Sequence, residues 1–278
     1  MVRTIRVAHS PDSDDAFMFY ALAAGKFDTG DLVFEHELQD IETLNRRALA
    51  GELDVTAVSI HACAYLADRY ALLPHGASMG EGYGPRIVAR EPFAPADLAG
   101  RTVAVPGTLT SAYLALRLFA PNVETEVVPF DLILPHVAAG KADAGLVIHE
   151  GQLTYAGEGL HLVTDLGEWW AHETGGLPLP LGGNVIRRDL GEETIRRVSR
   201  LLRDSIAWGL EHRAETVGYA LQYGRGLDIA QTDEFVGMYV NARTLDYGDD
   251  GRRSVQLFLD RGFEAGVIPH RVIVEFVA

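Results

Sequence analysis

The sequence predicts an α/β protein built as two lobes, and two observations support this. Short apolar runs typical of buried strands alternate with segments whose apolar residues recur at helical spacing. A unit also recurs: Ala-Gly-Glu-Leu-Asp-Val at 50–55 matches Ala-Gly-Lys-Ala-Asp-Ala at 139–144. Each copy ends a helix, turns through glycine and starts an apolar strand. Two related α/β lobes that face each other are the expected outcome.

Composition limits the classes of function. The 278 residues are 47% hydrophobic, enough for one large domain or two ordinary ones. A formal charge of −15 argues against nucleic acid or an anionic membrane as partner. The single cysteine, Cys63, excludes an internal disulfide and a cysteine-based metal cluster, and we interpret it as a small buried hydrophobe. No signal in the sequence fixes an oligomeric state.

The amino terminus begins a strand almost at once and shows no apolar stretch followed by a small-residue cleavage site. No apolar run approaches the roughly 18 residues needed to cross a bilayer. We therefore expect a cytoplasmic protein that does not enter the membrane.

The first lobe begins with alternating elements. Ser13 or Asp14 is expected to cap the first helix, and Gly25 to end it. The loop before this helix either contributes polar groups to a ligand pocket, or Asp14 and Asp15 only favour the positive end of the helix. The expected strands are 5–8, 32–37 and one beginning near 55, and the expected helices are 16–23 and 40–50.

Two crossings are expected between the lobes. The first lies near residues 80–90, where three glycines and a proline suit a hinge, a close backbone approach to ligand, or an ordinary turn. The second is expected near 181–186. Lobe 1 would then comprise residues 1–87 and 186–278 and lobe 2 residues 88–185, with the ligand cleft between them. A helical tail follows, with helices at 192–210, 214–221, 232–245 and 251–262.

A helix start in the second lobe is a candidate binding site. A strand at 102–105 breaks at Pro106-Gly107, and a helix begins at Thr110 or Ser111. Hydroxyls and free backbone N–H groups at a helix start can hold an anion. The other interpretation is an N-cap with no ligand, and the sequence favours neither. It is not a phosphate-binding P-loop, because no Lys-Ser or Lys-Thr pair follows the glycine.

His149 is the candidate for proton transfer. Ala144–Ile148 is a wholly apolar run that suits a buried parallel strand, so His149 would lie at the carboxyl end of this strand. Ligands bind at that edge of open α/β sheets, and imidazole exchanges protons near neutral pH. The alternative is that His149 is one of ten histidines without a special role. The repeated unit places Ser59 on the opposite rim.

The remaining part of the second lobe gives weaker signals. A strand at 127–129 and a helix at 132–139 precede the histidine strand. The segment after residue 167 looks irregular and aromatic. Trp169 and Trp170 could stack on a flat ligand or cap a core. His172 has no partner at metal-ligand spacing, so we expect it on the surface.

Several motifs are spread along the chain. They are Ser10-Pro11 with Asp14-Asp15-Ala16-Phe17, Asp40-Ile-Glu-Thr-Leu-Asn45, Gly82-Tyr-Gly-Pro85, Val103-Ala-Val-Pro-Gly107, Gly145-Leu-Val-Ile-His-Glu150 and Leu-Pro-Leu-Pro-Leu-Gly at 177–182. Together these motifs resemble the 1,4-dihydroxy-6-naphthoate synthase family, and two lobes with two crossings resemble the type II periplasmic-binding-protein fold. The resemblance covers nearly all of the chain.

The resemblance implies a lyase of menaquinone biosynthesis that splits cyclic de-hypoxanthine futalosine, a small-molecule carboxylate, without a metal or organic cofactor. It implies that His149 is the proton acceptor. It also implies substrate contacts from the strand end at Ala57, Val58 and Ser59 and from the hydroxyl pair Thr110 and Ser111. Asp14 is a further candidate for substrate contact.

The chain departs from the family pattern at two places. Family members tend to read Ser-Pro-Cys-Pro-Asn-Asp where residues 10–15 read Ser-Pro-Asp-Ser-Asp-Asp, and Thr-Thr where this chain has Thr110-Ser111. The first departure affects whether Asp14 touches substrate. Two other functions stay open: a chorismate dehydratase, which is not expected to carry the Ile-His-Glu strand end, and a non-catalytic small-molecule binding protein.

Overall fold

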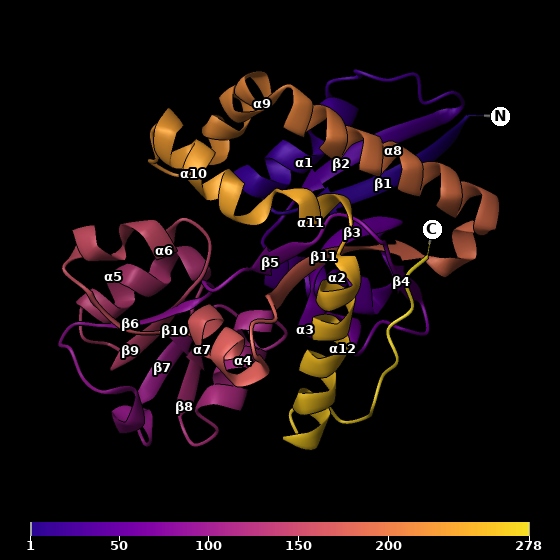
Figure 1. The fold of residues 1–278 in the computed structure, drawn as a ribbon. Helices are drawn as coiled ribbons and strands as arrows, with labels where there is room; N and C mark the ends of the chain where they lie inside the picture. The colour runs from indigo at the N-terminus through magenta and orange to yellow at the C-terminus, as the bar shows by residue number, and fades with distance from the viewer. Residues whose placement is uncertain (1, 278) are drawn as a thin grey trace.

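The computed structural model describes residues 2–277 and consists of two α/β lobes (Figure 1). The first sheet has the order β2-β1-β3-β11-β4, with β5 also paired to β11, and the second has the order β10-β6-β9-β7-β8. The first sheet contains β1 (Arg3–His9), β2 (Leu32–Leu38), β3 (Val55–Ser59), β4 (Tyr70–Leu72), β5 (Ser78–Gly80) and β11 (Leu179–Arg187). The second contains β6 (Arg86–Ala89), β7 (Thr102–Val105), β8 (Glu124–Val127), β9 (Ala144–Val147) and β10 (His161–Asp165).

Helices connect and cover these strands. They are α1 (Ser13–Ala23), α2 (Ile41–Ala50), α3 (Ile60–Cys63), α4 (Ser111–Phe119), α5 (Ile133–Ala138), α6 (Gly151–Thr154), α7 (Leu166–Thr174), α8 (Glu192–Glu211), α9 (Arg213–Ala220), α10 (Ile229–Tyr239), α11 (Ala242–Leu245) and α12 (Gly248–Glu264). Short 3₁₀ turns are η1 (Pro95–Leu98), η2 (Phe130–Leu132), η3 (Tyr155–Glu158), η4 (Arg188–Leu190) and η5 (Leu221–Tyr223).

The two lobes repeat one topology, as the recurring glycine turn predicts. In the first, β1 pairs in parallel with β2 and β3, and β11 adds antiparallel to β3. In the second, β7 pairs in parallel with β8 and β9, and β6 adds antiparallel to β9. The predicted α/β fold with two related lobes is confirmed, and α1 and α4 occupy equivalent positions after the first strand of each unit.

The two crossings differ in how well the sequence locates them. The first lies at 81–85, between β5 of the first sheet and β6 of the second, within the expected range, although the expected lobe limit at residue 87 falls inside β6. The predicted second crossing at 181–186 was wrong, because these residues lie within β11, which pairs with β3, β4 and β5. The chain crosses at 175–178, so the lobe limit expected at residue 185 falls inside a strand of the first sheet.

Gly183 in β11 is required by packing, which the amino-acid composition alone does not show. A Cβ on Gly183 would lie 2.4 Å from the Tyr247 hydroxyl, so the strand needs glycine there to let the tyrosine approach. Glycines in the first crossing and in the facing helix α7 also allow a close approach. A Cβ on Gly167 of α7 would lie 1.9 Å from the Tyr83 carbonyl oxygen, and one on Gly84 of the crossing would lie 3.0 Å from the Gly167 nitrogen. These two glycines therefore allow the backbone of the crossing to approach the backbone of α7.

The helical tail is confirmed, with changes in detail. α8, α9 and α10 pack on α1 of the first lobe, whereas α12 lies along β11 and contacts both α3 and α4 (Figure 1). The helix predicted at 232–245 is two helices, because Asn241 caps α11 after α10 ends at Tyr239. The strand predicted at 127–129 was wrong in its bounds: β8 spans Glu124–Val127 and pairs only with β7 in the described sheet. Such an edge strand has no need of a continuous apolar run.

One hydrophobic cluster runs through both lobes. It includes Val58 of the first sheet, Val103 of the second, and Trp170 with Phe258 between α7 and α12. The Trp170 and Phe258 ring centroids lie 5.3 Å apart, and the indole N–H donates to the Ser254 hydroxyl at 3.1 Å. Of the two interpretations of the tryptophans, the core role is confirmed for Trp170. The expected irregular segment was wrong at this point, because Trp169 and Trp170 lie on α7.

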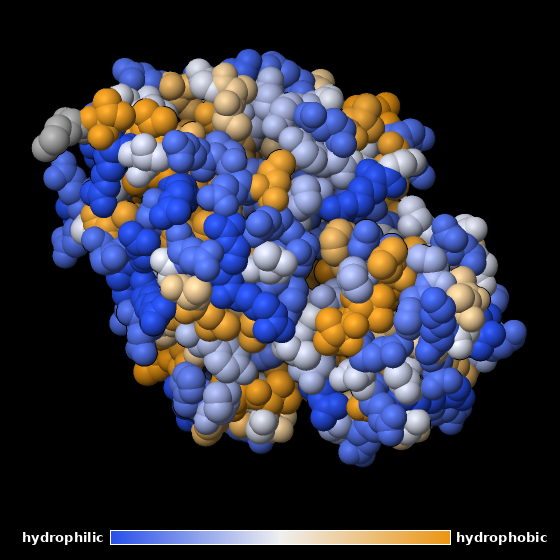
Figure 2. Space-filling view, turned by 180° about the vertical axis from the view of Figure 1, so that it is seen from behind, coloured by the Kyte–Doolittle hydropathy of each residue, from blue (hydrophilic) through white to orange (hydrophobic). Residues whose placement is uncertain are grey.

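The surface agrees with the acidic composition. Figure 2 shows a mostly hydrophilic face with smaller hydrophobic patches. Within residues 2–277, no helix combines the length and the apolar character that a bilayer span requires.

Candidate active site

A cavity between the lobes is lined by all the predicted catalytic and substrate-binding residues. Its empty volume is about 700 Å³, counting space open to solvent. The residues at the carboxyl ends of equivalent strands meet there: the loop after β1, the end of β3, the loop after β7 and the end of β9. The structure brings together every predicted site residue, namely Asp14, Ala57, Val58, Ser59, Thr110, Ser111 and His149. Their contacts with substrate stay a prediction.

β9 delivers His149 to this cavity. Ala144–Val147 is fully buried, and His149 follows with φ of 53°, a left-handed conformation that is uncommon for a residue with a side chain. Such conformations cost on the order of 1 kcal/mol and persist where surrounding contacts hold them. The ring packs edge-on against Phe130 with centroids 5.0 Å apart, and only 16% of the side chain is exposed.

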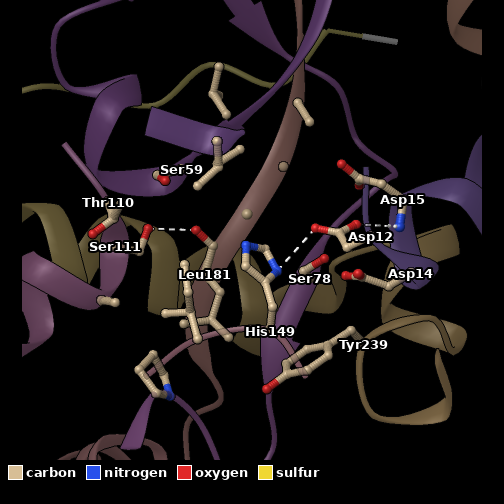
Figure 3. A pocket seen from close by; sticks show the side chains of 18 of the residues that line it. Asp12, Asp14, Asp15, Ser59, Ser78, Thr110, Ser111, His149, Leu181 and Tyr239 are labelled. Carbon is tan, nitrogen blue, oxygen red and sulfur yellow. Dashed lines mark hydrogen bonds and ion pairs between the residues drawn. The ribbon is translucent and has the colours of Figure 1, made fainter. Parts of the chain in front are cut away.

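Asp12 holds the ring of His149 from the other lobe. Asp12 Oδ2 lies 3.0 Å from His149 Nδ1, and Asp12 Oδ1 accepts the backbone N–H of Asp15 at 3.2 Å (Figure 3). Asp12 is thus the N-cap of α1, and the prediction of Ser13 or Asp14 as the cap was wrong, because the helix begins at Ser13. The buried Nε2 atom of His149 has no hydrogen-bond partner among the described residues. One ring nitrogen is therefore fixed and the other is available to a ligand.

The ion pair shifts the pKa of both His149 and Asp12. Burial by itself lowers the pKa of His149, but the adjacent Asp12 carboxylate outweighs it, and the pKa is raised above 6.5. Burial by itself raises the pKa of Asp12, but the His149 imidazolium outweighs it, and the pKa is lowered. The carboxylate therefore favours a proton on Nδ1, which leaves the Nε2 lone pair of the neutral ring for proton abstraction.

Asp14 is a second carboxyl group in the cavity, with different chemistry. It is 8% exposed, and its Oδ1 atom is without a hydrogen-bond partner in the described chain. Burial, together with the charges of Asp12 and Asp15, raises its pKa well above the ordinary value. Asp14 therefore holds its proton more tightly than an ordinary aspartic acid and can donate it or a hydrogen bond, whereas Asp12 loses its proton more readily.

The opposite wall is the start of α4. Thr110 caps it, accepting the Tyr113 N–H at 3.1 Å and donating to the Gly107 carbonyl at 2.9 Å. Ser111 Oγ donates to the Leu181 carbonyl at 2.5 Å and accepts the His61 N–H at 3.2 Å. Both hydroxyls are thus engaged within the protein. What the helix start offers a ligand is its positive end and first-turn backbone N–H groups, which have no partner inside the helix.

Ser59 is held in place by a residue that sequence reasoning missed. Its N–H donates to Asn45 Oδ1 at 2.9 Å, and Asn45 Nδ2 donates to Ser59 Oγ at 3.1 Å. Asn45 is fully buried on α2 and closes the motif Asp40-Ile-Glu-Thr-Leu-Asn45. A buried amide on the inner face of a helix, within a motif that carries the family resemblance, is the signal that could have identified it.

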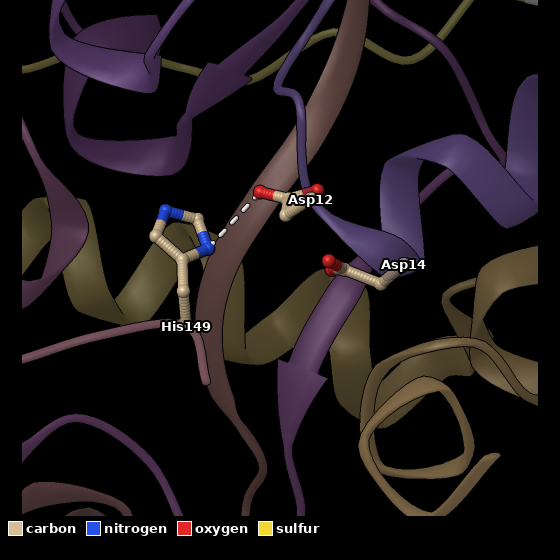
Figure 4. A group of neighbouring side chains, drawn as sticks. All are labelled: Asp12, Asp14 and His149. Carbon is tan, nitrogen blue, oxygen red and sulfur yellow. Dashed lines mark ion pairs between the residues drawn. The ribbon is translucent and has the colours of Figure 1, made fainter. Parts of the chain in front are cut away.

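The same cluster meets a geometric criterion for a metal site. Asp12, Asp14 and His149 each offer a ligand atom, and these atoms lie within 4.8 Å of one another (Figure 4). The direct ion pair between Asp12 and His149 accounts for their proximity without a metal. A cation would have to compete with that pair and take the proton from Asp14. The residues fit proton transfer better than metal binding.

The other sequence candidates lie outside the chemistry of the cavity. Cys63 is buried, and burial raises the pKa of its thiol to about 12, as suits a small hydrophobe. The side chain of His172 is 86% exposed, which confirms its surface position. Glu150 does not contact the His149 ring by hydrogen bond; its Oε2 accepts from Arg225 Nη1 at 2.9 Å.

Comparisons with known proteins identify the family of the chain. A family model described as menaquinone biosynthesis matches residues 5–264. The chain is 41% identical over 272 residues to 1,4-dihydroxy-6-naphthoate synthase of Streptomyces coelicolor, covering 96% of this chain and 95% of the relative. It is 44% identical over 254 residues to the enzyme of the same name from Thermus thermophilus, covering 91% and 92%.

Solved structures show the same fold. A protein of Archaeoglobus fulgidus is 47% identical with a TM-score of 0.91, over 95% of this chain and 98% of that one. The alkanesulfonate-binding protein SsuA of Xanthomonas axonopodis pv. citri is 15% identical with a TM-score of 0.72, over 98% and 96%. At that identity only the fold is shared, and it is the two-lobed fold of periplasmic binding proteins.

Proposed function

Because the chain belongs to the menaquinone biosynthesis family, we propose that it is a carbon–carbon lyase that converts cyclic de-hypoxanthine futalosine into 1,4-dihydroxy-6-naphthoate. One observation carries the chemical part of this proposal. The imidazole of His149 reaches a cavity between two lobes with Nδ1 bound to Asp12 and with Nε2 unpartnered among the described residues. This is the arrangement of a general base held in one tautomer.

His149 supplies the base. Cleavage of the carbon–carbon bond beside the spiro-linked sugar needs removal of a proton from a hydroxyl group or from carbon, while the electron pair moves toward a carbonyl. Formation of the aromatic naphthalene ring provides driving force, and the sugar-derived fragment leaves. The electrons stay within one substrate, so the reaction needs neither oxidant nor reductant. A positioned base typically gives a rate gain of about 10²–10⁴.

The start of α4 holds the carboxylate of the substrate in this proposal. Its backbone N–H groups and positive end attract an anion, and Thr110 and Ser111 keep the turn rigid through their own hydrogen bonds. Holding the carboxylate at one wall fixes the distance from the reacting proton to His149 Nε2. Asp14, kept neutral by its surroundings, donates to an oxygen of the substrate on the other side.

Two other functions make different predictions. A chorismate dehydratase of the same fold would act on chorismate, and a binding protein would act on neither compound. The His149–Asp12 pair favours catalysis, because simple binding does not require an oriented base. The purified protein is therefore mixed with cyclic de-hypoxanthine futalosine and, separately, with chorismate. We expect 1,4-dihydroxy-6-naphthoate in the first mixture alone, and loss of chorismate in the second would overturn the proposal.

A further inference from the structure

Arg225 connects the two loops that carry Asp12 and His149. It lies between η5 and α10, where Nη1 donates to Glu150 Oε2 at 2.9 Å and Nη2 donates to the Pro11 carbonyl at 2.7 Å. Pro11 precedes Asp12 in the first lobe, and Glu150 follows His149 in the second. A single guanidinium therefore spans the cleft next to the ion pair of the active site.

The same side chain also covers the ring that packs against His149. The guanidinium carbon of Arg225 lies 4.6 Å from the centroid of Phe130, and Phe130 meets the His149 ring edge-on. A planar guanidinium can lay its face on an aromatic ring while its N–H groups donate in the plane to two separate acceptors, whereas an ammonium group has no such plane. Arg225 thus restrains His149 through two neighbours, Glu150 and Phe130.

Burial and backbone conformation show that this arrangement is held firmly. Glu150 is 4% exposed, and Arg225 is its salt-bridge partner in the described structure. A buried carboxylate that loses its partner is costly, so the segment after His149 depends on Arg225. Among residues 2–277, His149 and Arg225 are the two non-glycine residues with positive φ, at 53° and 44°. The two strained backbone positions are joined through Glu150.

We propose that Arg225, acting through Glu150, Phe130 and the Pro11 carbonyl, is a positioning residue that sets the His149 imidazole against Asp12 when the lobes are closed. This inference rests on the proposed function only where turnover is measured. Arg225 is not among the residues that line the cavity, and its side-chain hydrogen bonds within the described residues go to Glu150 and the Pro11 carbonyl.

Turnover by Arg225→Ala is the first test, with Arg213→Ala as the matched control. Arg213 lies on α9, pairs with Asp233, and has a side chain 35% exposed against 30% for Arg225. A misplacement of about 1 Å at a reacting group can lower a rate by ~10². We expect kcat of Arg225→Ala to fall by about ten- to a hundredfold with a smaller change in KM, and kcat of the control to stay near wild type. Equal kcat values in both variants would overturn the proposal.

The tautomer of His149, read by ¹⁵N NMR of histidine-labelled protein, is the second test and needs no turnover. Wild type is expected to hold the proton of the neutral ring on Nδ1, and Arg225→Ala to show both tautomers. The charged or titratable groups around the ring are Asp12, Glu150 and Arg225, with Asp14 and Asp15 beside them. If Arg225 acted only as a charge, its removal would raise the His149 pKa and leave the tautomer intact, which would contradict positioning.

Two further variants keep the test decisive if Arg225→Ala does not fold. Arg225→Lys keeps the positive charge but lacks the planar guanidinium that donates to both Glu150 and Pro11. Glu150→Gln keeps the shape of the side chain without its charge. Both are expected to reproduce part of the loss in kcat and the mixed tautomer, and wild-type behaviour in both would overturn the proposal. If wild type releases no naphthoate while the tautomer still depends on Arg225, the proposed function fails and the positioning role stands.

Discussion

The first helix of each lobe begins at the same cavity, but the two helix starts carry different chemistry. α1 follows β1 and has acidic residues at its start, with Asp12 as the cap and Asp14 and Asp15 in the first turn. α4 follows β7, has Thr110 as the cap and has no acidic residue in its first turn. The positive end of α1 thus carries carboxyl groups of its own start. Before the cap of α4, the Leu109 N–H donates to Glu42 Oε2 at 3.1 Å, and in our proposal the N–H groups of the first turn bind the carboxylate of the substrate.

The residues at the ends of β3 and β9, the third strand of each repeated unit, also differ between the lobes. β3 ends at Ser59, whose hydroxyl is held by Asn45 of its own lobe. β9 is followed by His149, whose ring is held by Asp12 of the other lobe. In our proposal, one topology used twice therefore gives a binding wall from one pair of elements and a proton-transfer pair from another. Both depend on contact between the lobes, because Ser111 at the start of α4 hydrogen-bonds the Leu181 carbonyl of β11 and the His61 N–H.

Removal of the base is expected to have the largest effect. His149→Gln takes away the ring nitrogen that faces the cavity, so kcat should fall by about 10²–10⁴, the usual contribution of a positioned base. Binding of 1,4-dihydroxy-6-naphthoate, measured by calorimetry, should stay within a few fold, because α4 is unchanged. His172→Gln, at the exposed histidine of α7, is the control and should be unaffected. Full turnover by His149→Gln would remove the base from the mechanism.

Giving α4 an acid would break the contrast between the two helix starts. Thr110→Asp keeps a capping side chain but places a negative charge where the carboxylate of the substrate is proposed to bind. A charge at a helix terminus is worth up to ~2 kcal/mol, so KM should rise by about tenfold with little change in kcat. Thr110→Asn, a neutral cap of the same shape, is the comparison. Steady-state kinetics in which both variants match would show that this helix start does not bind the carboxylate.

Replacing an acidic residue of α1 tests the same contrast between the two helix starts. Among these variants it is expected to have the smallest effect on the rate. The raised pKa of Asp14 means that the folded state binds a proton more tightly than the unfolded state. Stability is therefore lost as pH rises above the ordinary value of 3.8 toward the raised pKa. Asp14→Asn escapes this loss and should unfold at a higher temperature than wild type at neutral pH, with the difference vanishing in acid. Thermal scans with parallel pH dependence for both proteins would show that Asp14 ionises freely.

The residues that sequence reasoning located share a local signal. His149 follows a wholly apolar strand, and Thr110 follows a strand and a Pro-Gly break, so periodicity and punctuation place both at a sheet edge. Ala57, Val58 and Ser59 came from the family resemblance, and the repeated unit supports their place on the opposite rim. Gly183 in β11 is needed for packing and does not mark a turn, so the same rules misplaced the second crossing between the lobes.

The residues that sequence reasoning missed act across the fold. Asp12 meets His149 only because β1 and β9 bring their ends to one cleft, and Arg225 reaches Glu150 from a turn between η5 and α10. No periodicity within either segment encodes these contacts. Position 12 carried a signal that went unused, since it is the place where this chain has Asp and the family tends to have Cys.

The dependence of kcat/KM on pH for wild type and Asp12→Asn tests most directly whether Asp12 holds His149 as the base. The base acts when neutral, so the rate of wild type should rise with pH through a pKa raised above 6.5. Without the carboxylate, burial dominates, so in Asp12→Asn the rising limb should move to lower pH and the plateau should fall by about ten- to a hundredfold. An unmoved limb with an unchanged plateau would contradict the account.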